Sequence, residues 1–111
     1  MKYKDDFEYE EDIDTFYIYH NSDNEEVIGS ILMGNFVYDV SISGKIVGLE
    51  IDSASKLFNV EPSLFVKAKN VGLTVNTQAD YIVIRFFIQL ANENYVRDFV
   101  IPRNKIPIMA S

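Results

Sequence analysis

The fold class is decided by residues 14–58, DTFYIYHNSDNEEVIGSILMGNFVYDVSISGKIVGLEIDSASKLF. Over most of this stretch apolar side chains recur at every second position, the spacing of strands with one buried face. Three breaks rich in turn-forming residues separate four such runs: residues 21–26, 34–35 and 43–44. Ala54, Leu57 and Phe58 then follow helical spacing, with Asp52 or Ser53 placed to cap the helix. The stretch therefore predicts a four-stranded antiparallel meander closed by a short helix.

A second helix and three more strands are predicted downstream. Pro62 suits a first helical turn, and Leu64 and Phe65 supply the apolar side of a short helix. Alternation then returns in three runs, at residues 71–76, 81–90 and 95–101. Residues 81–90 hold an unbroken apolar row, which would promote aggregation at an open sheet edge. We therefore expect this strand to be paired on both sides and to pack against a second sheet.

The expected fold is α+β and β-rich. About seven antiparallel strands would form a sandwich or half-barrel, with two short helices between the fourth and fifth strands. At 111 residues the chain has room for a single domain. We divide it into an acidic lead-in at 1–13, the meander and helix at 14–58, the second helix and later strands at 59–102, and an extended tail at 103–111.

Charge is distributed unevenly along the chain. The net charge is −7, and residues 1–61 hold 14 acids and 4 bases, whereas residues 62–111 hold 3 acids and 6 bases. Such a chain lacks the basic footprint that nucleic-acid binding requires, so no nucleic-acid partner is expected. The acidic half favours a basic protein partner or a second copy of the chain.

Cellular location is predicted from what the sequence lacks. There is no cysteine, and small secreted domains often depend on disulfides. No apolar run reaches the ~18–20 residues that cross a bilayer, and the acidic N-terminal residues do not resemble a targeting segment. We expect a cytoplasmic protein without a membrane partner.

The candidate partner-binding residues lie at both ends of the chain: Asp5, Asp6, Glu8, Glu10, Glu11, Asp12, Ile106, Ile108 and Met109. The acidic set lies in a lead-in that we expect to be extended and partly frayed, because closely spaced like charges repel one another in a tight hairpin. The three apolar residues of the tail would either fold back on the core or dock on another subunit.

Candidates for catalysis and metal binding are few. His20 is the only histidine, so no histidine cluster is available, and we expect it to be structural. Asp39 and Glu50 should both face outward and could approach each other across neighbouring strands, as paired acid/base carboxylates do. The acidic stretches lack the glycine of a calcium-binding loop. We expect no catalytic residue, no metal and no cofactor.

Three motifs within residues 14–58 resemble the family catalogued as domain of unknown function 2283 (DUF2283). They are Asp14-Thr15-Phe16-Tyr17-Ile18, Gly44-Lys45-Ile46-Val47-Gly48-Leu49-Glu50-Ile51 and Ala54-Ser55-Lys56. Glu10 stands where members of the family tend to have an aspartate in the lead-in. The resemblance implies a strand meander and no established activity, and the C-terminal part of the chain extends beyond it.

These observations favour a small non-catalytic protein-binding or regulatory module that forms a homodimer. The alternative is a small-ligand-binding protein or an enzyme that uses outward carboxylates such as Asp39 and Glu50. The resemblance also implies an antitoxin-like partner of a small basic toxin, because the resembled family includes relatives encoded beside small toxin-like proteins.

Overall fold

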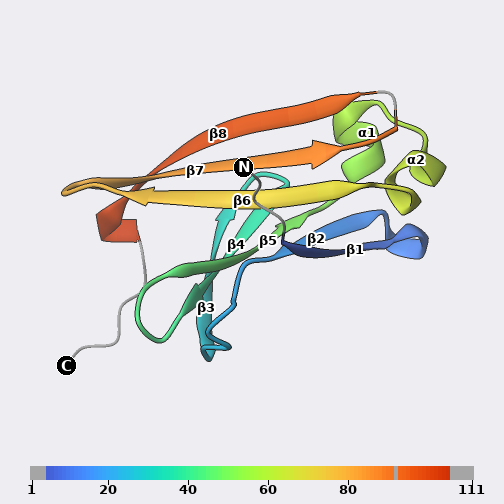
Figure 1. The fold of residues 1–111 in the computed structure, drawn as a ribbon. Coiled ribbons are helices and arrows are strands. Elements are labelled where there is room, and N and C mark those ends of the chain that lie inside the picture. Colours follow the sequence, from blue (N-terminus) through green and yellow to red (C-terminus); the bar gives the residue numbers. More distant parts are fainter. Residues whose placement is uncertain (1–4, 92, 106–111) are drawn as a thin grey trace.

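The computed structural model describes residues 5–91 and 93–105, which form eight strands and two short α-helices. The first sheet is antiparallel and has the order β1-β2-β5-β4-β3. Its strands are β1 (Asp6–Glu10), β2 (Thr15–Tyr19), β3 (Val27–Met33), β4 (Phe36–Ser41) and β5 (Ile46–Ile51). The second sheet consists of β6 (Asn70–Thr77), β7 (Tyr81–Gln89) and β8 (Asn94–Pro102), in that order. Helices α1 (Ala54–Phe58) and α2 (Pro62–Val66) lie together at one end of the sheets (Figure 1).

Two antiparallel sheets with two short helices confirm the α+β, β-rich class, but the expected count of seven strands is wrong. The additional strand is β1, because the acidic lead-in forms a hairpin with β2 through the 3₁₀ turn η1 (Glu11–Ile13). The apolar side of β1 packs against the core and so stabilises this hairpin. The ring centroids of Phe7 and Phe16 are stacked 5.7 Å apart, and those of Tyr9 and Phe65 lie 5.2 Å apart. Alternation turns the carboxylates to solvent, where their mutual repulsion is screened. The helices consequently lie between the fifth and sixth strands, not between the fourth and fifth.

The predicted meander is wrong in its strand order. Strands β3, β4 and β5 are consecutive hairpins, but β2 pairs with β5, with Phe16 opposite Ile51. Strand β2 thus precedes three hairpin-linked strands and lies beside the last of them, which is a Greek-key arrangement traced in the reverse direction. The physical reason is burial: β5 is buried at every position except the half-buried Glu50, so it occupies the centre of the sheet with a neighbour on each side.

The core lies between the two sheets. As predicted, β7 is paired on both sides, and its inward row is almost completely buried: Ile82, Ile84, Phe86 and Ile88. Across the interface, the Phe36 ring lies 5.9 Å from that of Phe86 and 4.6 Å from that of Phe99. The first sheet is therefore the packing partner that the apolar row of β7 requires.

The two helices close one end of this core. Pro62 stands in the first turn of α2, and Asn59 ends α1 in a left-handed conformation with φ of 57°. Neither Asp52 nor Ser53 caps α1 as expected, since the amide of Ser55 donates instead to Oδ1 of Asp14, 3.0 Å away. Neither described helix is long and apolar enough to cross a membrane.

Candidate functional site: the acidic face of the first sheet

The outer face of the first sheet carries rows of acidic and tyrosine side chains. Strand pairing places Glu8 opposite Tyr17, and Tyr17 opposite Glu50. Because side chains alternate between the two faces, residues opposite one another on paired strands face the same way. We call the resulting surface the acidic face and define it by eight residues: Asp6, Glu8, Glu10, Tyr17, Tyr19, Asp39, Glu50 and Asp52.

The two tyrosines form the apolar centre of the acidic face. Their rings stack with centroids 6.2 Å apart and planes inclined by 13°. The hydroxyl of Tyr19 donates to Glu8 at 3.1 Å. Partial burial raises the pKa of Tyr17, and the negative charge of Glu50 raises it further. Both phenols therefore stay protonated and offer ring surface together with an O–H group.

Glu50 has the most strongly perturbed carboxyl group of the acidic face. A hydrogen bond with Asp52, burial, and the negative charges of Asp52 and Asp39 raise its pKa from 4.5 to about 7. Like charges this close disfavour ionisation of one member of the group. The perturbation shows a local excess of negative charge that no cation of the described chain neutralises, because no ion pair reaches Glu50, Asp52 or Asp39 there.

Asp39 and Glu50, the pair singled out from the sequence, are diagonal neighbours. Asp39 lies opposite Gly48 and Val37 lies opposite Glu50 on β4 and β5. A side chain at Gly48 would place its Cβ 3.1 Å from Oδ2 of Asp39, so the missing side chain leaves room for this carboxylate. The closer partner of Glu50 is Asp52, one of the two residues predicted as a cap for the first helix. Its spacing of two from Glu50, directly after the end of β5, was the signal that could have revealed the pair.

The predicted acidic partner residues lie in two different environments. Asp6, Glu8 and Glu10 lie exposed on the outer side of β1, and Glu11 and Asp12 are exposed in the adjoining turn. Asp5 instead turns inward, as described below. The predicted apolar partner residues Ile106, Ile108 and Met109 lie outside the described residues.

Asp5 connects the two sheets. Its Oδ2 accepts from the amide of Leu73 at 2.8 Å and lies 3.0 Å from Nδ1 of His20. Its own amide donates to the carbonyl of Val71 at 2.8 Å. The side chain of Asp5 is 17% exposed. These contacts explain Asp5 and His20 as a structural link between β2 and β6.

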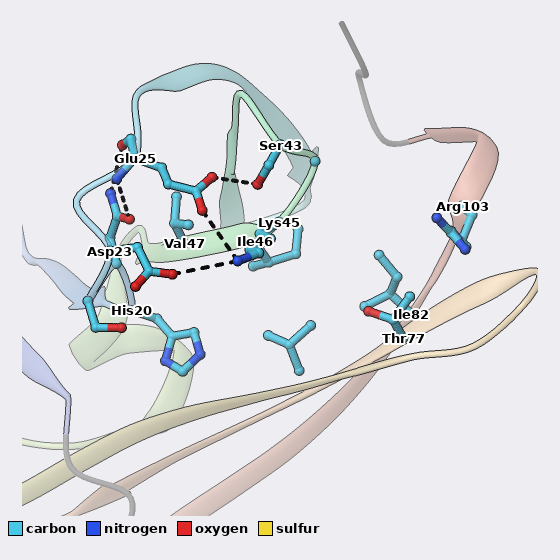
Figure 2. Close-up of a pocket in the computed structure, with 14 residues that line it drawn as sticks. His20, Asp23, Glu25, Ser43, Lys45, Ile46, Val47, Thr77, Ile82 and Arg103 are labelled. Atoms are coloured by element: carbon cyan, nitrogen blue, oxygen red, sulfur yellow. Dashed lines mark hydrogen bonds and ion pairs between the residues drawn. The ribbon is translucent and has the colours of Figure 1, made fainter. Parts of the chain in front are cut away.

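A second candidate site is a cleft of about 450 Å³ where the two sheets diverge. Figure 2 shows Lys45 directed toward Asp23 and Glu25 on one side, with Thr77 and Arg103 on the other. Lys45 Nζ lies 3.3 Å from Glu25 and 3.6 Å from Asp23. These polar groups come from two loops of the first sheet, the end of β6 and the 3₁₀ turn after β8, so no local motif could have indicated the cleft.

The cleft is lined by polar and apolar groups in about equal measure. Three of the apolar residues that line it are buried. Ile46, Val47 and Ile82 are only 3%, 6% and 4% exposed. Ligand sites are usually lined mainly by accessible apolar groups with a few polar ones. The carboxylates at the rim are already engaged, since Glu25 also accepts from the hydroxyl of Ser43. The acidic face is therefore the stronger candidate.

Carboxylates in the described part of the chain form no group of three or more suited to a metal ion.

In comparisons with known proteins, no family model, curated protein or solved structure matches the chain. The resemblance of residues 14–58 to DUF2283 stays a prediction.

Proposed function

We propose that the protein is a non-catalytic binding module whose acidic face receives a basic segment of a partner protein. The observation that carries this proposal is the grouping of Glu8 and Glu50 on either side of Tyr17, with no ion pair to Glu50 among the described residues. The same crowding, with burial and a hydrogen bond to Asp52, raises the pKa of Glu50 to about 7. A lysine or arginine from a partner would relieve this repulsion and would gain charge-assisted hydrogen bonds. A site that is electrostatically unfavourable in the free protein is thereby suited to a cation.

The tyrosines support a protein partner. Tyr17 and Tyr19 present stacked rings beside the carboxylates, and such rings attract lysine and arginine through cation–π contacts. Tyrosine is also enriched in protein interfaces, because its ring buries apolar area while its hydroxyl can stay hydrogen bonded. A nucleic acid would be repelled by the same carboxylates. A small basic toxin, as the family resemblance suggests, is one partner with the required charge.

The alternative of an enzyme or small-ligand protein finds less support. Asp39 and Glu50 lie on the outer face and do not line the cleft. Catalytic carboxylates usually act in a recess that restricts water and orients a substrate. The outward position of this pair favours surface recognition.

Binding of an oligolysine peptide to paired variants tests the proposal. At pH 8, where Glu50 with its pKa of about 7 is mostly ionised, Glu8→Gln/Glu50→Gln removes nearly two charges from the acidic face, while Asp80→Asn/Glu93→Gln removes two exposed charges elsewhere. Because an exposed ion pair contributes about 0.2–1 kcal/mol, the first variant should weaken binding roughly two- to thirtyfold and the second much less. Added salt should weaken binding to the wild type. Equal losses in both variants would show that net charge alone attracts the peptide, and would overturn the proposal.

A further inference from the structure

The outer edge of the first sheet at β3 has a β-bulge between Val27 and Gly29, and beyond it the strand is regular and carries no charge. Among the described residues, β3 has a single neighbouring strand, β4. Its sequence, Val-Ile-Gly-Ser-Ile-Leu-Met, contains no charge and no proline, and Leu32 is 75% exposed. Proteins usually guard an edge strand with lysine, other charges or proline. Here β1 carries three carboxylates, and β8 carries Asp98 and Pro102. The remaining edge strand, β6, also lacks charge and proline. Its backbone groups at Val71 and Leu73 are, however, hydrogen bonded to Asp5.

The backbone of β3 presents free hydrogen-bonding groups along this edge. Gly34 and Asn35 form a two-residue turn, with Gly34 at a φ of 62°, and Met33 lies opposite Phe36. The residues that flank such a turn bond to each other, and the direction of the backbone groups alternates along the strand. Leu32 and Ser30 therefore direct their N–H and C=O groups away from β4.

We propose that two copies of the chain pair antiparallel along β3, so that their five-stranded sheets become continuous. An uncharged strand is complementary to itself, because no like charges come to lie opposite one another at its centre. The antiparallel direction also keeps Glu26, just before β3, away from its counterpart. A parallel arrangement would place the two carboxylates side by side, whereas antiparallel pairing separates them by roughly 25 Å, well beyond the Debye length of about 8 Å.

A second copy fits this edge better than a partner of opposite charge. The two-fold axis of such a pair lies near the middle of the strand, at Ser30, and brings Leu32 of each copy toward Ile28 of the other. Each exposed leucine is then covered by an apolar side chain. The contact is small compared with the ~1,200–2,000 Å² of stable interfaces, so the dimer should dissociate on dilution.

This proposal is independent of the proposed function, and salt separates the two. Each copy carries a charge of −7, so added salt screens repulsion and should strengthen the dimer. Binding of a basic peptide to the acidic face should weaken under the same conditions. Either proposal can therefore fail without the other.

Sedimentation equilibrium of the full chain tests the dimer. The protein concentration should span about 1 µM to about 1 mM, the range in which a dimer with a small interface dissociates. The wild type should change from monomer to dimer, and Leu32→Lys should remain monomeric. Val96→Lys on the outer face of β8 is the matched control, because Val96 is 60% exposed, and this variant should dimerise like the wild type. A wild type that stays monomeric, or a Leu32→Lys variant that dimerises equally well, would overturn the proposal.

Amide hydrogen exchange provides a second readout at the level of single residues. The amides of Ser30 and Leu32 should exchange more slowly as the protein concentration rises, while exposed amides in the turn around Asp80 should not change. Slower exchange confined to β8 would place the contact on the other sheet and contradict pairing along β3.

Discussion

Asp14 and Ser55 are joined by two hydrogen bonds, although 41 positions separate them. The amide of Ser55 donates to Oδ1 of Asp14 at 3.0 Å, and its hydroxyl donates to Oδ2 at 2.8 Å. The hydroxyl of Tyr9 donates to the same carboxylate at 2.6 Å. Asp14 therefore caps α1 and fixes the hairpin of β1 and β2 against it.

Replacement of Asp14 should weaken the fold at this junction. Asp14→Ala removes the helix cap and the acceptor of Tyr9, which should lower the free energy of unfolding by about 1–3 kcal/mol. Asp14→Asn should cost less, because asparagine tolerates the φ of 53° found here. Ser55→Ala removes one hydroxyl and should cost the least. Urea denaturation of the three variants should show this order of losses in the free energy of unfolding. An Asp14→Ala variant as stable as the wild type would contradict the capping role.

The junction should also be sensitive to acid. Although burial opposes it, hydrogen bonds from Tyr9 and Ser55 hold the pKa of Asp14 below its ordinary value of 3.8. The ionised carboxylate therefore stabilises the fold above pH 3.8, and this contribution is lost as the pH falls through the lower pKa of the folded state. Thermal unfolding should be measured between pH 2 and pH 5. As the pH falls, the melting temperature of Asp14→Asn should decrease less than that of the wild type. Parallel curves would refute the assignment.

Glu50 should make stability fall as the pH rises. Its pKa is about 7 in the folded protein and 4.5 ordinarily, so the folded state binds the proton more tightly than the unfolded chain. The associated stabilisation is fully present below pH 4.5 and is lost as the pH rises through 7. Glu50→Gln should remove this decline and should melt above the wild type at pH 8. The exposed Glu93→Gln serves as the control, and an unchanged pH profile in Glu50→Gln would contradict the crowded acidic face.

The protein should be less stable with Tyr38 than with phenylalanine at the same position. It is fully buried, and its hydroxyl has no hydrogen-bond partner in the described part of the protein. An unpaired buried hydroxyl costs about 1–3 kcal/mol, so Tyr38→Phe should raise the free energy of unfolding by that order. Tyr95→Phe, which loses only an exposed hydrogen bond to Glu93, should have little effect. A destabilised Tyr38→Phe would show that the hydroxyl is paired after all.

Gly72 should tolerate a side chain only when Phe87 is shortened. The two residues are opposite each other on β6 and β7, and a Cβ at Gly72 would collide with the ring of Phe87. Gly72→Ala should therefore destabilise the protein by about 1–3 kcal/mol. In a Phe87→Ala background the same change should cost little, because alanine is otherwise favoured over glycine in a strand. A double-mutant cycle measures this coupling, and additive effects would argue against the contact.

The sequence predicted the strands well and their arrangement less well. The alternation of β7 and the turn at Gly34 and Asn35 are local signals, and both features appear in the structure. The pairing of β2 with β5 is not a local property, because every strand of the sheet shows a similar alternation. The strand β1 was not predicted, because closely spaced carboxylates favour an extended chain over a hairpin. In the structure the packing of Phe7 and Tyr9 outweighs this repulsion.

The candidate site could be predicted only in part. The acidic residues of β1 follow from composition, but their grouping with Tyr17 and Glu50 depends on strand register. Asp14 and Asp5 gave no signal of their roles, since each contacts groups that fold next to it from distant parts of the chain. Tertiary contacts of this kind have no spacing that a single sequence reveals.

Mapping of the surface that a basic peptide contacts tests the central claim most directly. Amide chemical shifts of the full chain would be followed by NMR during titration with oligolysine. The account predicts that the largest changes occur on β1, β2 and β5 around Tyr17 and Glu50, and that they disappear at high salt. Changes centred on the second sheet, or on the loops around Asp23 and Lys45, would contradict it.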